Sequence, residues 1–384
     1  MSIRFGVNYL PRRNWWYEWG EDGTAAWDDD LGRLAELGFD HIRVQCLWPV
    51  FQPNPDWVSP RALRRLGQLL DIADAHGLAV CVTILDGWLS GFDFRPAWLK
   101  SLPAYTDREA IRAAAFLVRA VAESVAGHPA LWCIDIANEP NVLMGGLRRG
   151  EGEAWARTML AEARRAGAPV TVGADHDPWM NDAAPLSREF LVQNSDLVAV
   201  HAWPYFTGAL AAVGEEKAWA IPDYLAQIAR GTPGADGKPL WIQELGVSEL
   251  WLDRIEVSDF AEAMLRRSAA VPGVAAISWW ASHDIPRRFT GFDELEYGLG
   301  LIDEEGRLKP VGARIVDVIA QLRRMSEPVS DPSAERPEPS QQTLAPEGGR
   351  TGIAFAAQWF EQMDAVAGPR IAAAPISATE GVGR

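Results

Sequence analysis

Short apolar runs alternate with longer amphipathic stretches along this chain up to about residue 325. The runs are rich in β-branched residues and are bounded by glycine, proline or polar residues, which is typical of strands buried on both faces. The pattern predicts eight such strands, at residues 4–9, 41–46, 79–85, 131–137, 170–173, 197–201, 240–245 and 274–280.

The stretches between the runs have the spacing of amphipathic helices. In the first of them, Trp27, Leu31 and Leu34 lie on one face, and a glycine follows soon after. The second opens with Ser59 and Pro60, an N-cap followed by the first helical position. The helices predicted in this way include residues 24–37, 59–76, 106–126, 151–166 and 311–325.

Strands that alternate with helices form parallel sheets with right-handed crossovers. Eight such units indicate the α/β class and a closed (β/α)8 TIM barrel rather than an open doubly wound sheet. We expect one barrel domain at residues 1–325, followed by a Pro/Ser-rich linker or disordered segment at 326–350. Residues 351–384 form a short C-terminal tail that is not a separate domain and is either disordered or docked on the barrel.

The composition limits the expected binding partners and the expected cellular compartment of the protein. The formal net charge of −16 repels phosphate backbones, so nucleic acid is not an expected partner, whereas a neutral sugar is compatible with it. No apolar run reaches the roughly 20 residues needed to span a bilayer, and no secretory signal pattern is evident. The three cysteines fall inside predicted strands, and their odd number fits a reducing compartment. We therefore expect a cytoplasmic protein without a membrane partner, and the oligomeric state stays open.

Candidate chemistry lies where the strands end, because the carboxyl ends of the strands in a parallel barrel face one common site. Glu139 follows the fourth predicted strand, and Glu244 lies near the end of the seventh. Hydrolysis of a glycosidic bond needs such a pair: one carboxylic acid protonates the leaving oxygen, and one carboxylate attacks or activates water. Two structural surface glutamates are the alternative, but charged residues rarely end apolar strands without a function.

The sequences around this pair resemble a known group of enzymes. Glu139 lies in IDIANEP and Glu244 in WIQELG, and both segments resemble motifs of the (β/α)8 glycosidase clan that includes glycoside hydrolase family 5. The segments FGVNYLPRRNWWYEW, HIRVQCLWPVFQPN and LSGFDFRPAWL are similar to a bacterial branch of that family known for exo-acting β-mannosidases. The resemblance covers about residues 3–325.

The resemblance implies roles for further residues. Arg43 would lie beneath the nucleophile Glu244, Asn138 would bind the 2-hydroxyl of the substrate, and Trp280 would form the floor of the −1 subsite. Trp88 stands near the place where the family usually has a histidine, at the end of the third strand, and is a further candidate for substrate binding. A plain salt bridge for Arg43 and a core position for Trp280 are the alternatives.

Two places leave alternatives open. The His-x-Tyr of the family's sixth strand reads His-Ala-Trp here, starting at His201, another expected substrate-binding residue. We therefore expect Tyr205 to hydrogen-bond the nucleophile, with loop packing as its alternative role. His283 and Asp284 follow the eighth strand, and either bind hydroxyls of the terminal sugar or stabilise their own loop.

These observations predict a retaining glycoside hydrolase that cleaves β-linked sugars by double displacement, with Glu139 as acid/base and Glu244 as nucleophile. The expected substrate is a small oligosaccharide or glycoside, and the resemblance favours an exo-β-mannosidase. An endo-β-1,4-mannanase or glucanase and a non-catalytic sugar-binding barrel are the alternatives. No cofactor and no metal are expected, because the six histidines do not occur at metal-ligand spacing.

Overall fold

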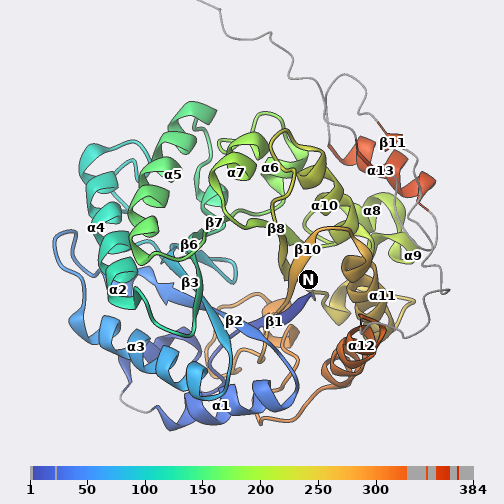
Figure 1. Ribbon diagram of the computed structural model, residues 1–384, viewed down its shortest axis with the longest axis horizontal. Helices are drawn as coiled ribbons and strands as arrows, with labels where there is room; N and C mark the ends of the chain where they lie inside the picture. Colours follow the sequence, from blue (N-terminus) through green and yellow to red (C-terminus); the bar gives the residue numbers. More distant parts are fainter. Residues whose placement is uncertain (1–2, 22–23, 327–342, 345–351, 364–369, 372–384) are drawn as a thin grey trace, which may run out of the picture.

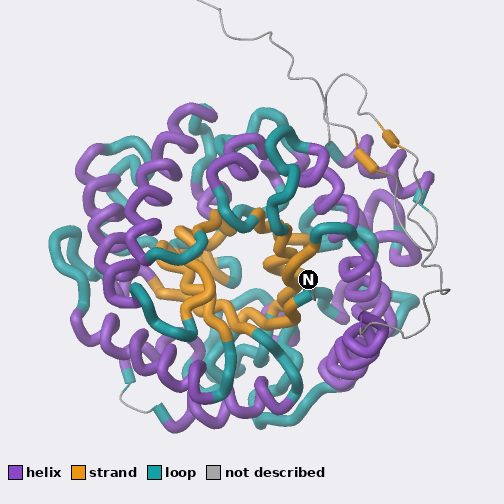
Figure 2. Tube along the Cα trace, in the orientation of Figure 1, coloured by secondary structure: helices purple, strands orange, loops and turns teal. Residues whose placement is uncertain are grey.

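The computed structural model describes residues 3–21, 24–326, 343–344, 352–363 and 370–371 of the chain. Eight parallel strands form a ring at its centre, and helices surround this ring (Figures 1 and 2). Hydrogen bonds join the strands in the order β7-β6-β3-β2-β1-β10-β9-β8, and β7 and β8 lie next to each other where the ring closes. The strands are β1 (Arg4–Asn8), β2 (His41–Leu47), β3 (Ala79–Asp86), β6 (Leu131–Asn138), β7 (Val170–Gly173), β8 (Val198–Ala202), β9 (Leu240–Leu245) and β10 (Val274–Trp280).

The observed elements confirm the predicted (β/α)8 barrel, and their ends agree with the expected ones to within a few residues. Side-chain caps fix two of the helix starts. Ser59 accepts a hydrogen bond from the Ala62 amide at 3.2 Å, and Asp107 accepts one from the Ala110 amide at 2.9 Å. The longer helices are α1 (Ala25–Glu36), α3 (Pro60–Ala75), α4 (Arg108–Val125), α5 (Arg149–Ala163), α10 (Ile221–Gly231), α11 (Val257–Ala270) and α12 (Pro310–Ser326).

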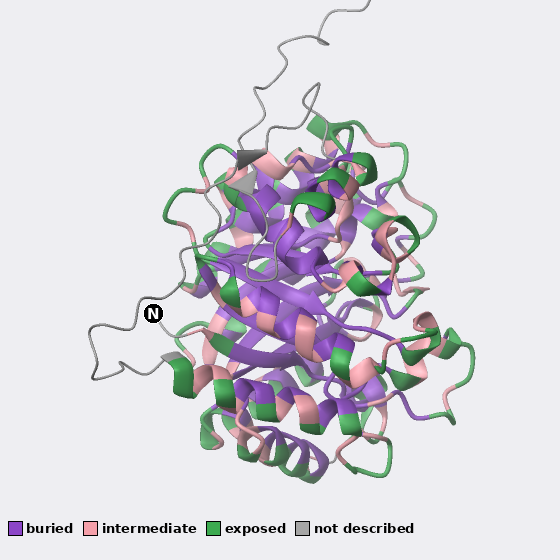
Figure 3. Cartoon of the chain, turned by 90° about the vertical axis from the view of Figure 1, so that its right-hand side faces the viewer, coloured by how far each residue is buried: buried purple, intermediate pink, exposed green. Residues whose placement is uncertain are grey.

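The barrel has two buried regions. A large hydrophobic core fills the space between the strands and the surrounding helices, which is the buried layer in Figure 3. A smaller cluster contains Cys81, Cys133 and Trp241 and packs against Trp132. Its residues come from or adjoin β3, β6, β8, β9 and β10, which places the cluster inside the ring, where barrels of this kind are filled by side chains. The cavity of the ring is therefore filled, and a ligand must bind at an end of the barrel.

The tail beyond the barrel contains one further helix, α13 (Ile353–Gln362), which lies beside α8 (Ala209–Val213) and α10 (Figure 1). Phe355, Trp359 and Phe360 of α13 are buried, and the Trp359 ring lies 5.4 Å from the ring of Tyr224 in α10. Of the two expectations for the tail, docking on the barrel therefore holds for this helix. Most of the expected linker, at 327–342 and 345–351, lies outside the described residues. None of the helices in the described part of the chain is long and apolar enough to cross a membrane.

Candidate active site

The two glutamates that the sequence singled out meet at the carboxyl ends of the strands. Glu139 directly follows β6, and Glu244 is the fifth residue of the six-residue strand β9. Three atoms lie within 4.8 Å of one another: one carboxylate oxygen of Glu139, one of Glu244, and a ring nitrogen of His201 from β8. The barrel therefore brings three titratable side chains from three different strands into one small volume.

The backbone around Glu139 is unusual and is made possible by its neighbours. Glu139 has φ 42° and ψ 48°, a left-handed conformation that is uncommon for residues other than glycine and is found most often at functional sites. Its amide donates to the carbonyl of Gly173 at 2.6 Å, which ties it to the end of β7. A Cβ at Gly173 would lie 2.5 Å from Asp135 and 2.9 Å from Arg43, so only glycine leaves room for these side chains.

Arg43 on β2 is the centre of the polar network below the site. Its side chain is fully buried and donates to Glu244 at 2.6 Å, to Asp135 at 2.8 Å and to the Asn138 side-chain oxygen at 2.7 Å. Burial acts to lower the pKa of Arg43, but the charges of Asp135 and Glu244 outweigh burial and raise it. Arg43 thus stays charged and gives the nucleophile candidate Glu244 a permanent buried counter-charge.

A proton must lie between His201 and Glu139. Gln243 donates its amide hydrogen to Asp135, so its carbonyl oxygen faces His201 Nε2 at 2.8 Å, and this ring nitrogen carries a hydrogen. A neutral imidazole then has only a lone pair at Nδ1. The 2.7 Å contact between Nδ1 and Glu139 Oε1 therefore needs a second proton, held by the carboxyl of Glu139 or by the ring.

The two carboxylates have different surroundings. Burial raises the pKa of Glu139, the hydrogen bond to His201 lowers it, and the charge of Glu244 raises it again, so that the net shift is upward. Burial would lower the pKa of His201, but the charge of Glu244 and the bond to Glu139 raise it overall. Glu244 lies farther from this proton, with its Oε2 at 3.4 Å from His201 Nδ1, and its two oxygens accept from Arg43 and from the indole N–H of Trp203. Glu139 therefore shares a proton with His201, whereas Glu244 accepts hydrogen bonds from two fixed donors.

Comparison with known proteins adds an independent observation. No family model and no curated protein matches the sequence, but solved structures do. A family 5 glycoside hydrolase of the GH5_18 type from Streptomyces cattleya, solved in complex with GlcNAc, is 32% identical to this chain. The match covers 90% of this chain and 84% of that chain, with a TM-score of 0.81. The chain belongs to glycoside hydrolase family 5.

Two further structures place this family 5 chain among related enzymes. A GH5_18 variant from Bifidobacterium longum subsp. longum, in complex with Manβ1-4GlcNAc, is 27% identical and has a TM-score of 0.85, with 97% of this chain and 91% of that chain covered. The exo-β-1,4-mannosidase Op5Man5 from Opitutaceae bacterium strain TAV5 is 23% identical, which shows the shared fold (TM-score 0.72, covering 89% of this chain and 62% of that chain). The chain is thus a glycoside hydrolase, and one of its structural neighbours binds Manβ1-4GlcNAc.

One expected contact of the family 5 site is made by a different residue. Tyr205 was expected to hydrogen-bond the nucleophile, but Trp203 Nε1 donates to Glu244 Oε2 at 3.2 Å, and that expectation is wrong. Trp203 can approach because Gly246 follows β9, where a Cβ would lie 2.8 Å from the indole ring. Tyr205 is 54% exposed and stacks on Trp251 with ring centroids 5.0 Å apart.

Other expected residues lie around the pair in varied roles. Asn138 accepts from Arg43 and donates to the backbone oxygen of Trp88 at 2.7 Å, so it joins the strand-end network to the loop after β3. Trp280 is 4% exposed at the end of β10, next to β1 and β9. His201 is fully buried between Glu139 and Gln243, so the structure places it behind the acid rather than in the open cleft.

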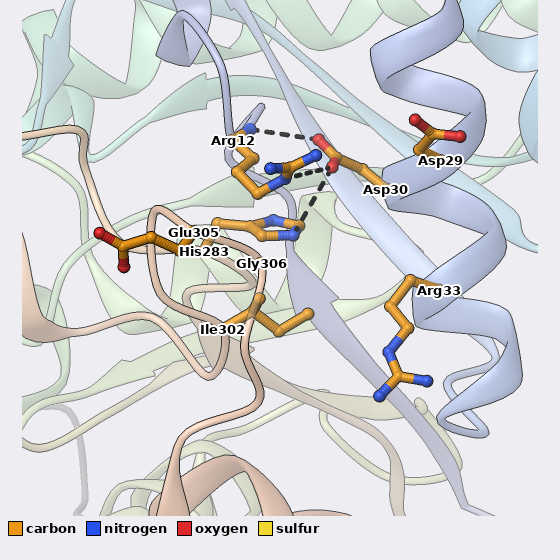
Figure 4. Close-up of a pocket in the computed structure, with 8 residues that line it drawn as sticks. All are labelled: Arg12, Asp29, Asp30, Arg33, His283, Ile302, Glu305 and Gly306. Carbon is orange, nitrogen blue, oxygen red and sulfur yellow. Dashed lines mark hydrogen bonds and ion pairs between the residues drawn. The ribbon is translucent and has the colours of Figure 1, made fainter.

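His283 and Asp284 do not join the carboxylate pair. The ring of His283 is hydrogen-bonded to the Leu10 carbonyl at 3.1 Å and lies 3.8 Å from Asp30, lining a separate pocket beside α1 (Figure 4). Asp284 accepts from Lys309 at 2.9 Å and from the Gly300 amide at 2.8 Å. These contacts support the alternative role, stabilisation of the loops after β10, and the expected role in binding the terminal sugar stays a prediction.

Sequence reasoning missed three residues of the site. Asp135 is a fully buried acid inside the apolar strand β6, and that mismatch alone was a signal of function. Trp203 lies two residues after His201, just beyond the end of β8, where strand alternation continued by one residue would put it on the same side; this was a second signal. Glu296, in the 3-10 helix η5 (Glu294–Gly298) of the loop after β10, is close enough to both catalytic candidates to feel their charges. Nothing in the local sequence pattern indicated it.

Proposed function

We propose that this family 5 enzyme is an exo-acting β-mannosidase that cleaves small β-mannosides, such as Manβ1-4GlcNAc, with retention of configuration. The observation that carries the proposal is the close carboxylate pair, with a proton source on Glu139 and fixed donors on Glu244. The substrate class rests on the relatives, since GH5_18 enzymes are solved in complex with Manβ1-4GlcNAc and with GlcNAc.

The spacing of the pair supports double displacement. Retaining glycosidases have carboxyl groups about 5–5.5 Å apart, whereas inverting enzymes need about 6.5–9.5 Å to admit a water molecule. Oxygens of Glu139 and Glu244 lie within 4.8 Å of each other. This spacing fits the retaining range rather than the inverting one, and it favours direct attack by a carboxylate.

In the first step, Glu244 attacks the anomeric carbon while Glu139 gives its proton to the glycosidic oxygen, and the aglycone leaves as a neutral alcohol. In the second step, Glu139 takes a proton from water, which attacks the glycosyl-enzyme and releases Glu244 as a carboxylate. His201 holds the Glu139 oxygen at 2.7 Å through both steps, and Arg43 and Trp203 stabilise the Glu244 carboxylate when it is released.

Aromatic residues support the exo assignment. The loops after β1, β3 and β10 meet in one cluster: Trp15 lies 5.4 Å from Phe94 and 5.2 Å from Phe292, and Phe92 lies 4.9 Å from Phe292. We infer that this aromatic wall closes the glycone end of the site, so that one terminal sugar is admitted. The exposed ring of Tyr205, which stacks on the half-buried Trp251 on the β8 and β9 side, offers a flat surface for the aglycone sugar.

Two other functions were expected as alternatives. An endo-β-1,4-mannanase or glucanase needs a cleft that is open at both ends, which the aromatic wall disfavours. A sugar-binding barrel without activity needs no proton source at Glu139 and no buried counter-charge beside Glu244, so both features disfavour this alternative. The three cysteines are free and buried, which supports the expected reducing, cytoplasmic setting.

The experiment is a substrate panel with a matched control. The purified enzyme is assayed against p-nitrophenyl β- and α-glycosides of mannose, glucose and galactose, against Manβ1-4GlcNAc, and against a long mannan. We expect hydrolysis of the β-mannoside and release of mannose from the disaccharide, without shortening of mannan from within, and no activity for Glu244→Ala. A preference for another sugar, or rapid loss of mannan viscosity, contradicts the proposal.

A further inference from the structure

A third carboxyl group near the catalytic pair has no role in double displacement. Glu296 lies in η5, in the loop that follows β10. Its Oε2 oxygen is buried and, within the described part of the chain, has no hydrogen-bond partner. Buried polar atoms are nearly always hydrogen-bonded, so an unpaired carboxyl oxygen beside an active site indicates a partner that binds there.

The charge state of Glu296 follows from its surroundings. Burial raises its pKa to about 8, and the charges of Glu244 and Glu139 act in the same direction. The hydroxyl of Ser90 acts in the opposite direction, although no hydrogen bond of good geometry joins it to Glu296 and its oxygen is likewise buried and unpaired. At neutral pH the side chain is therefore a neutral carboxylic acid, with one O–H donor and one carbonyl acceptor.

Contacts between loops place these two residues beside the catalytic strands. Ser90 lies in the turn between β4 (Trp88–Leu89) and β5 (Phe92–Asp93), and the Asn138 side chain donates to the backbone of Trp88. The hairpin therefore abuts β6, the strand that precedes Glu139. On its other side, Phe92 packs on Phe292 of the loop that carries Glu296. Glu296 and Ser90 thus lie on the loops that carry the aromatic wall at the proposed glycone end.

We propose that Glu296, with Ser90, binds a hydroxyl group of the terminal mannosyl residue in the −1 subsite and selects for substrates that carry this hydroxyl. The inference rests on the proposed function, because it assumes a glycone in this subsite. A carboxylic acid donates to and accepts from the same or a neighbouring hydroxyl, which satisfies both unpaired groups. A substrate without this hydroxyl leaves them buried and unpaired, and a site built to hydrogen-bond a hydroxyl discriminates strongly against such analogues.

The test combines enzyme variants with modified substrates, as in a double-mutant cycle, and measures whether the two changes affect kcat/KM independently. Wild type, Glu296→Ala and Glu296→Gln are assayed on p-nitrophenyl β-mannoside and on its 2-, 3-, 4- and 6-deoxy derivatives. We expect one deoxy substrate to lose about 5- to 150-fold in kcat/KM with wild type, the range for a buried group left unpaired. On the parent substrate, kcat/KM of Glu296→Ala should fall by a similar factor relative to wild type. On that deoxy derivative, kcat/KM of Glu296→Ala should be close to that of wild type. Glu296→Gln, which keeps a donor and an acceptor, should recover most of the activity.

Glu294→Ala is the matched control, because Glu294 lies in the same 3-10 helix but is exposed and paired with Arg287 at 2.8 Å. It should leave every kcat/KM unchanged. If the effects of Glu296→Ala and of each deoxy position multiply independently, Glu296 binds no hydroxyl and the inference is wrong. If wild type prefers another glycoside to the β-mannoside, the proposed substrate fails, and the same cycle on deoxy forms of the preferred glycoside still tests Glu296.

Discussion

Substitution of the buried arginine at the centre of the site measures how much its charge contributes to the stability of the protein and to catalysis. Arg43 has no exposed side-chain surface and pairs with Asp135, which is also fully buried, and with Glu244, which is 4% exposed. Replacement of one partner of a buried pair leaves an uncompensated charge and costs about 3–5 kcal/mol. Arg43→Met keeps an unbranched apolar stem but removes the guanidinium and leaves two carboxylates without their counter-charge, so we expect a loss of at least about 3–5 kcal/mol in the free energy of unfolding.

Arg119→Met is the control, because Arg119 makes a pair of similar geometry with Glu162 at 2.9 Å but is 45% exposed. Exposed pairs contribute about 0–1 kcal/mol, so this variant should be nearly as stable as wild type. Both are measured by urea denaturation followed by tryptophan fluorescence. The Arg43 variant should also lose about 100-fold or more in kcat/KM, since preorganised charges at a reacting group have effects of this size. Equal stability of the two variants would refute the electrostatic account of the site.

Three further predictions follow from the site. As pH rises through the raised pKa of Glu139, the acid form is lost and kcat/KM should fall. This fall should be weaker for a dinitrophenyl β-mannoside than for Manβ1-4GlcNAc, whose leaving GlcNAc needs protonation, and an identical fall for both would argue against Glu139 as the acid. Trp203→Phe should lower kcat/KM about 10-fold by removing one donor to Glu244, whereas Trp57→Phe at an exposed site should not; equal kinetics would deny Trp203 this role. Activity should survive EDTA, because side chains and water carry every step; a loss reversed by zinc or manganese would instead place a metal on Glu139, His201 and Glu244.

The barrel was predictable because its signal is local. Each strand is a short apolar run that ends near polar residues, as at β3, where residues 79–85 were expected and Ala79–Asp86 are observed. The carboxyl ends of parallel strands converge, so two glutamates at the ends of β6 and β9 had to approach each other once the barrel closed. Position in the fold, together with the motifs around the two glutamates, therefore carried the prediction of the site.

Loops did not allow the same reasoning. Tyr205 comes after Pro204, where the chain has left β8, and its direction depends on packing against Trp251 rather than on strand alternation. His283 and Asp284 lie beyond β10, and their directions are set by distant residues such as Asp30 and Lys309. These contacts between residues far apart in the sequence leave no periodic signal. The buried face of α13, by contrast, follows helical spacing, but its docking site on α10 is again non-local.

The roles of the two glutamates are tested most directly by the anomeric configuration of a rescued product. Glu139→Ala lacks the base that activates water, but an aryl β-mannoside with a good leaving group still forms the glycosyl-enzyme on Glu244. Azide needs no base to attack this intermediate. We therefore predict that azide accelerates Glu139→Ala and that NMR shows β-mannosyl azide, the product of two inversions. An α-mannosyl azide would show a single displacement and would contradict the assignment of Glu244 as nucleophile and Glu139 as acid/base.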